Sequence, residues 1–138
     1  MRLPADESRR RAGTARVARI ATVGPDGSPH LVPICFALQA GTLYSSTDAK
    51  PKTTSNLRRL RNIERDPRVT VLVDHYEDDW TRLWWVRMDG EARVLHAGAE
   101  RDVAIELLVA RYPQYCEHPP QGVVVAVDVS RWTGWSYA

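Results

Sequence analysis

Residues 84–94, WWVRMDGEARV, carry the clearest alternation of apolar and polar side chains in the chain. Apolar or small residues occupy every second position from Trp84 to Val94, and the positions between them are mostly charged. A period of two is typical of a β-strand with one face in the core. Gly90 lies near the middle, where we expect the strand to bend or bulge, as strands do at the corner of a barrel.

Other strand-like segments flank this one. Apolar patterns predict strands over residues 16–23, 30–38, 42–47, 69–74 and 122–129, and the aromatic tail 131–137 is a candidate for one more. The run 30–38 is nearly all apolar, so we expect it to be buried on both faces. The Pro25-Asp26-Gly27 sequence marks a turn between the first two strands.

Three segments show the pattern of short helices. Residues 4–13 begin with acids and end with arginines, as the helix dipole favours. Residues 54–64 place Leu57, Leu60 and Ile63 on one side, and Asp66-Pro67 ends the helix. Residues 99–112 have their predicted buried side at Val103, Leu107, Leu108 and Tyr112. Together these elements predict a mostly β single domain over residues 1–138, an antiparallel barrel of six or seven strands with two to three short helices.

Composition bounds the class of protein. The 43% hydrophobic content excludes a disordered polymer, and no apolar run approaches the ~20 residues of a membrane span. Cys35 and Cys116 form no CxxC pair, and the N-terminus has no signal-like apolar core, so we expect free thiols and a cytoplasmic protein. The four histidines lack metal-binding spacing, so no metal site is expected.

The stretch Ser45-Ser46-Thr47-Asp48-Ala49-Lys50-Pro51-Lys52-Thr53 has the composition of a phosphate site. Lys50 and Lys52 are two positions apart and can face one anion, and Ser45 and Thr47 have the same spacing. Lysines and hydroxyls beside a helix start hold phosphate through charge-assisted hydrogen bonds and free N–H groups. The alternative is a hairpin end that is Ser/Thr/Lys-rich only because it is solvated.

The basic charge is concentrated next to this stretch. Between Lys50 and Arg68 there are seven Lys/Arg and two acids, although the whole chain has a net charge of only +2. This asymmetry is consistent with a bound anion, and equally with a solvated basic helix face. Nucleic-acid binding is disfavoured, because the basic residues lie mainly on one helix without interleaved aromatics.

Familiar catalytic and nucleotide-binding motifs are missing from the sequence. There is no G-x-S-x-G, no G-x-G-x-x-G and no Walker sequence. A nucleotide-like cofactor must therefore be bound in another way, and no catalytic residue is assigned. His75, Tyr76 and Arg87 are conceivable proton donors or substrate contacts.

The order of several fragments resembles the pyridoxamine 5′-phosphate oxidase-like split β-barrel superfamily. The fragments are 17–23 (VARIATV), 26–30 (DGSPH), Pro33-Ile34, 43–47 (LYSST), Lys52 with 56–58 (NLR), and 66–69 (DPRV). These fragments are followed by Leu72-Val73-Asp74, a later tryptophan and the G-x-A-x-V pattern of residues 90–94. This order resembles the branch that uses the deazaflavin coenzyme F420. The substrate residues that true pyridoxamine-phosphate oxidases carry near the C-terminus have no counterpart here.

This resemblance implies a fold, a cofactor and a site. It implies an FMN-binding type of split barrel and an F420-dependent oxidoreductase that passes hydride to a small organic acceptor. The alternatives are an FMN-dependent oxidase or reductase and a non-catalytic cofactor- or haem-binding protein. It implies a homodimer with cofactor sites at the interface. The five tryptophans are compatible with this, because protein interfaces are enriched in tryptophan. The implied cofactor-binding residues are Pro33 under the ring, Lys50 and Lys52 at the phosphate, and Ser45, Ser46, Thr47, Thr53 and Arg58 around it.

Overall fold

The computed structural model describes residues 1–46 and 54–138, and in this part of the chain eight strands form one antiparallel sheet. The sheet order is β3-β2-β6-β7-β8-β5-β4, with β1 paired to β8. The strands are β1 (Arg2–Leu3), β2 (Ala18–Val23), β3 (Pro29–Ile34), β4 (Ala37–Gln39), β5 (Thr42–Ser46), β6 (Arg68–His75), β7 (Trp84–Leu95) and β8 (Val124–Ser136). The predicted mostly β, antiparallel class with added helices is confirmed, and the fold is that of a split barrel.

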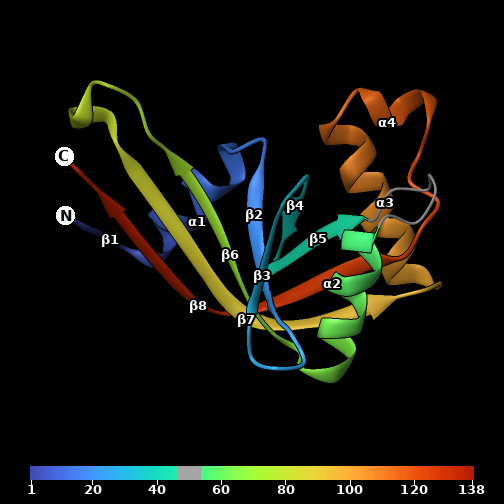
Figure 1. The fold of residues 1–138 in the computed structure, drawn as a ribbon. Coiled ribbons are helices and arrows are strands. Elements are labelled where there is room, and N and C mark those ends of the chain that lie inside the picture. Colours follow the sequence, from blue (N-terminus) through green and yellow to red (C-terminus); the bar gives the residue numbers. More distant parts are fainter. Residues whose placement is uncertain (47–53) are drawn as a thin grey trace.

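Strands β7 and β8 hold the two halves of the sheet together. Both are long and curved, and they run through both halves of the molecule (Figure 1). The predicted last strand and the aromatic tail are one continuous strand, β8, and the register between β7 and β8 shifts between Asp89 and Gly90. A Cβ on Gly90 would lie 2.2 Å from the carbonyl oxygen of Asp128, so the expected irregularity at this glycine is confirmed.

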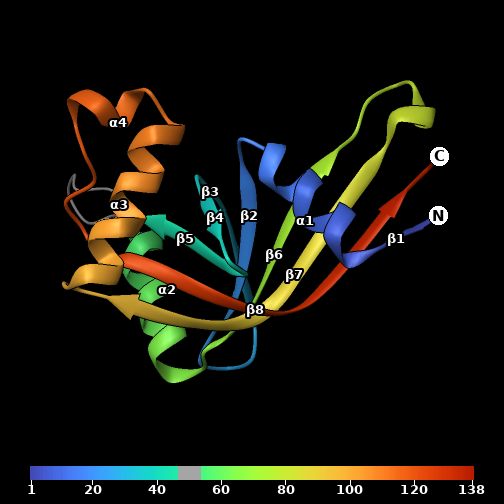
Figure 2. The same cartoon turned by 180° about the vertical axis from the view of Figure 1, so that it is seen from behind.

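The core lies against one face of the long strands. Val86 and Met88 of β7 are fully buried with Val71 and Val73 of β6, as the alternation of residues 84–94 predicted. Helix α1 (Ala5–Thr14) covers this face, and its Ala12 belongs to the same cluster (Figures 1 and 2).

The remaining helices lie toward the other half of the sheet. They are α2 (Thr54–Arg65), α3 (Ala99–Arg111) and the short α4 (Gln114–Glu117), and a 3₁₀ turn, η1, covers Trp80–Arg82. Helix α3 buries Ala104 and Leu108, which are four positions apart and therefore on one stripe. The predicted burial of Val103 is wrong, because it lies beside this stripe and is 40% exposed.

The apolar run 30–38 is not one doubly buried strand. The chain forms β3, then breaks at Cys35-Phe36, then forms β4, and these two strands are the opposite ends of the sheet order. Among the described strands β3 pairs only with β2, so it is an edge strand, and Leu31 lies on its exposed side and is 65% exposed. The hydroxyl of Tyr112 stabilises the break by accepting a 2.9 Å hydrogen bond from the Phe36 N–H and lying 3.0 Å from the Arg16 carbonyl oxygen.

Within the described residues, no helix combines the length and the apolar character needed to span a membrane.

Candidate functional site

A cavity of about 290 Å³ lies between β3, β5 and α2 and is lined by two of the predicted site residues. We call it the β3–β5 cavity, and its lining includes Val17, Pro33, Cys35, Ser46, Arg59 and Tyr115. Pro33 and Ser46 were both predicted from the sequence, and the fold brings them together from β3, at one end of the sheet order, and β5, next to the other end.

Polar groups in and beside this cavity suit an anionic ligand. Arg59, which lines the cavity, is only 6% exposed. Ser45, which precedes Ser46 on β5, is 3% exposed, and its Oγ has no hydrogen-bond partner among the described residues. Ser45 does not line this cavity, because successive side chains of a strand point to opposite faces.

Four predicted residues, Thr47, Lys50, Lys52 and Thr53, lie outside the described part of the chain. They belong to the segment between Ser46, the last residue of β5, and Thr54, the first residue of α2. Since Ser46 lines the β3–β5 cavity, the chain leaves the described strand at the cavity wall. The assignment of the two lysines to a phosphate therefore stays a prediction.

Arg58 does not line the β3–β5 cavity; the neighbouring Arg59 does. On α2 the residues buried toward the sheet are Arg59, Asn62 and Ile63, which share one side through their i, i+3 and i+4 spacing. The sequence pattern placed the arginines of this helix largely away from its apolar side, and the resemblance pointed to Arg58, so Arg59 was missed. Its spacing to the apolar Ile63 was the available signal.

Arg58 instead lines a second cavity, of about 570 Å³, next to the turn at residues 24–28. His30 and Asn62 also line it, and Asn62 donates a 3.0 Å hydrogen bond to Thr22 Oγ1. Burial, and then the nearby charges of Arg58 and Arg59, lower the pKa of His30 and so favour its uncharged imidazole.

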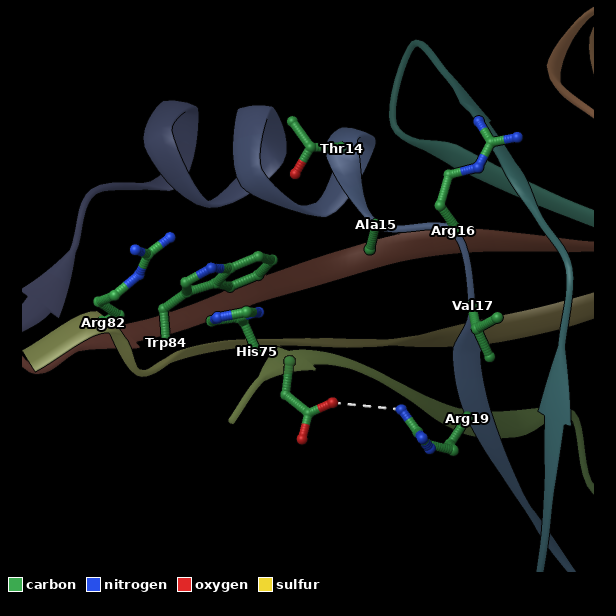
Figure 3. A pocket seen from close by; sticks show the side chains of 9 residues that line it. Thr14, Ala15, Arg16, Val17, Arg19, His75, Arg82 and Trp84 are labelled. Atoms are coloured by element: carbon green, nitrogen blue, oxygen red, sulfur yellow. Dashed lines mark hydrogen bonds and ion pairs between the residues drawn. The ribbon is translucent and has the colours of Figure 1, made fainter. Parts of the chain in front are cut away.

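A third cavity, of about 540 Å³, lies between the end of α1, the start of β2 and the adjacent ends of β6 and β7 (Figure 3). We call it the Trp84 cavity, and its lining includes Val17, Arg19, Asp74, His75, Arg82 and Trp84. The Arg19 guanidinium donates a 3.2 Å hydrogen bond to Asp74, and Figure 3 shows the rings of His75 and Trp84 side by side. Tyr76 and Arg87, which the sequence suggested with His75, are not part of this lining as the structure describes it.

The tryptophans divide between the core and other surfaces. Trp84 and Trp132 pack partly buried against the main core cluster. Trp85 and Trp135 lie directly opposite each other on β7 and β8, are half-buried and belong to none of the described core clusters. Trp80 is 68% exposed at the tip of the β6–β7 connection.

Comparison with known structures shows the same architecture elsewhere. A conserved hypothetical protein from Mycobacterium tuberculosis has a TM-score of 0.80 at 24% identity, over 98% of this chain and 86% of the other. A FAD-binding protein from Mesorhizobium loti has a TM-score of 0.74 at 23% identity, over 97% and 95%. A haem-binding protein from Mycobacterium smegmatis has a TM-score of 0.73 at 18% identity, over 96% and 57%. At these identities the likeness shows the fold alone.

Sequence comparison adds the family. No curated protein matches the sequence. The family model described as pyridoxamine 5′-phosphate oxidase matches residues 5–136, which is nearly the whole described barrel. The chain therefore belongs to the pyridoxamine 5′-phosphate oxidase family.

Proposed function

We propose that this protein is an oxidoreductase that binds coenzyme F420 in the β3–β5 cavity and acts on a small organic acceptor. The observation that carries the proposal is the convergence of Pro33, Ser46 and Arg59 on one cavity, at the point where the segment with both lysines begins. When bound, the deazaflavin supplies the hydride chemistry, and the protein supplies binding, orientation and charge.

Each group in the cavity has a defined role in this proposal. Arg59 and the Ser46 hydroxyl bind the phosphate end together with Lys50 and Lys52, and Pro33 supports the ring. The described lining offers the Arg59 guanidinium and the Ser46 hydroxyl, groups of the kind that bind phosphate. Arg58 and Arg61, exposed on α2, give a basic surface for the anionic tail of F420.

FMN is the second candidate, because a neighbour of the same fold is described as FAD-binding. FMN ends in a phosphate monoester and lacks an anionic tail, so it would use the cavity but not the exposed arginines of α2. A haem- or cofactor-binding protein without catalysis is the remaining alternative, in line with the haem-binding neighbour.

Parallel fluorescence titrations of the purified protein with F420 and with FMN test the proposal. Lys50→Ala combined with Lys52→Ala should weaken F420 binding about a hundredfold, since each charge-assisted hydrogen bond contributes about 1.5 kcal/mol or more. The control is Arg2→Ala with Arg131→Ala, which removes two exposed positive charges elsewhere and should leave the affinity nearly unchanged. Wild-type affinity in the lysine variant would refute the phosphate assignment, and preference for FMN would select that alternative.

The composition allows an independent readout. Lys50 and Lys52 are the only lysines in the sequence. Amine-reactive labelling, followed by peptide mass spectrometry that separates them from the N-terminus, should therefore slow at both lysines when F420 is added. Unchanged labelling at saturating F420 would contradict their contact with the cofactor.

We further propose a homodimer that uses the sheet face carrying Trp85 and Trp135. Leu72, on the strand next to β7, is also half-buried outside the described core clusters, and Leu31 on β3 is 65% exposed. Large apolar side chains on one open sheet face are typical of an interface. Trp85→Glu should convert the dimer to a monomer in sedimentation analysis, whereas Trp80→Glu at the exposed tip should not.

A further inference from the structure

The β3–β5 cavity and the Trp84 cavity share a wall. Val17, 44% exposed just before β2, lines both of them. A cofactor in the first cavity therefore has the second cavity as its neighbour. We propose that the Trp84 cavity is the acceptor subsite and that it binds a small planar carboxylate. This inference rests on the proposed function above, because it takes the cofactor to occupy the β3–β5 cavity.

One guanidinium of the Trp84 cavity is available to an anion. Three arginines, Arg16, Arg19 and Arg82, line it, against the carboxylate of Asp74 and that of Glu77 at its edge. Arg19 is paired with Asp74. Arg82 contacts Glu77 only through its Nε, so its terminal N–H groups are the ones placed to meet a ligand.

Contacts around the cavity hold the polar groups in position. Glu77 contacts both the His75 imidazole and, at 3.3 Å, the Arg82 guanidinium, so one carboxylate orients the two side chains at the rim. The side chain of Arg82 remains 68% exposed, which leaves its other N–H groups accessible to a ligand. Arg16 is directed away from the cavity and donates a 2.7 Å hydrogen bond to the carbonyl of Arg111 (Figure 3).

The aromatic side of the cavity favours a flat ligand. The Trp84 and His75 rings lie side by side beneath the end of α1, as Figure 3 shows. Trp84 packs partly buried against the core, and the Arg11 guanidinium lies 5.9 Å from its ring centroid, so the indole is held from more than one side. A fixed aromatic surface binds a planar ring better than a puckered one. The volume, about 540 Å³, is in the range of small-ligand sites.

Three small probes separate charge from shape. Benzoate is planar and anionic, benzamide is planar and neutral, and cyclohexanecarboxylate is anionic and puckered. Isothermal titration or ligand-observed NMR with the wild-type protein should show benzoate binding at least about tenfold more tightly than either of the others. A tenfold difference is the size expected when benzamide loses the charge contact or cyclohexanecarboxylate loses the aromatic contact. Equal affinities for the three would overturn the proposal.

Two substitutions should remove the two preferences separately. Arg82→Gln should bring benzoate down to the affinity of benzamide while keeping the preference for planarity. Trp84→Leu should bring benzoate down to the affinity of cyclohexanecarboxylate while keeping the preference for charge. If Trp84→Leu fails to fold, His75→Ala replaces it, with a partial loss of the planarity preference expected. Arg131→Gln, on an exposed part of β8, is the control and should change nothing. If both variants bind like wild type, the ligand does not use this cavity.

Titration of F420 and FMN in the same samples distinguishes this inference from the proposed function. Cofactor binding without benzoate binding would overturn the acceptor subsite and leave the proposed function standing. Selective benzoate binding without binding of any cofactor would overturn the acceptor role together with the proposed function. We expect the protein to bind both the cofactor and benzoate. Benzoate should compete with the acceptor during turnover, and it should not compete with the cofactor for binding.

Discussion

The arginines near the two ends of β7 differ in how fully carboxylates pair with them. Near the C-terminal end, Arg93 donates to Glu100 at 2.9 Å and to Asp128 at 2.7 Å, and Tyr44 donates to the same Glu100 at 2.8 Å. We call these four residues the Arg93 network. At the opposite end, Arg82 contacts Glu77 at 3.3 Å, and the Trp84 cavity remains open beside it.

This difference separates a structural cluster from a candidate binding site. In the Arg93 network, hydrogen bonds from Arg93 and then Tyr44 lower the pKa of Glu100 to about 2, and burial with the Glu100 contact raises the pKa of Tyr44 to about 12. The network attaches the start of α3 to β5, β7 and β8, and its charged groups are already paired with one another. At the Trp84 cavity, cationic and aromatic groups face open volume, so they can serve a ligand.

The largest expected effect concerns the bend between these two ends. Gly90→Ala places a methyl group 2.2 Å from the Asp128 carbonyl oxygen. The atoms that the methyl group meets belong to the backbone, so they can shift only if the strand itself is distorted. We expect a loss of about 3 kcal/mol in the free energy of unfolding, measured by urea denaturation. The control is Gly13→Ala in α1, where a Cβ meets nothing within 4 Å and should stabilise the helix by about 0.5–1 kcal/mol. Equal effects of the two variants would contradict this account of the bend.

The next effect concerns the attachment of α3 beside the β3–β5 cavity. Tyr112→Phe removes the oxygen that accepts from the buried Phe36 N–H and pairs with the Arg16 carbonyl. An unsatisfied buried donor costs about 1–3 kcal/mol, so we expect about 2 kcal/mol of lost stability. Tyr137→Phe, at a side chain 52% exposed, should be neutral in the same measurement.

A direct comparison of the two arginines follows. Arg93→Ala should reduce the free energy of unfolding by about 1 kcal/mol. The loss is limited because the ion pairs of Arg93 with Glu100 and Asp128 are partly exposed and screened by water. Arg82→Ala should leave stability nearly unchanged, since this side chain is 68% exposed with one long contact. If Arg82→Ala were the more destabilising of the two, the Trp84 end would be structural and the contrast would fail.

The smallest effect is a pH dependence of the Arg93 network. The folded-state pKa of Glu100 is lowered to about 2, and Arg93 also lowers that of Asp128. Carboxyl groups with depressed pKa values stabilise the folded state above their usual pKa, near 4, and lose this contribution as pH falls toward 2. Between pH 5 and pH 3 the wild type should therefore lose more stability than Arg93→Ala. Parallel pH profiles of the two proteins would contradict the assigned cause.

Local patterns were sufficient for most elements and for part of the site. The alternation in residues 84–94 predicted β7, its buried face and the irregularity at Gly90, because side-chain period and glycine conformation are local properties. The turn before β3 is likewise local: Asp26 accepts from the Ser28 N–H at 3.0 Å, and Gly27 has a positive φ of 84°. Pro33 and Ser46 were found through the resemblance of short fragments.

The long-range arrangement needed the folded chain. An apolar run such as residues 30–38 does not reveal that its strands become the two ends of the sheet order, since that depends on which distant strands pair. Helical periodicity did not show that Arg59 faces a cavity, because a cavity is formed by the elements opposite the helix. The position of Val17 between two cavities likewise exists only once β2, β3 and α1 are assembled. Amino-acid order thus specified the elements and their faces, and tertiary packing decided which of those faces met around open space.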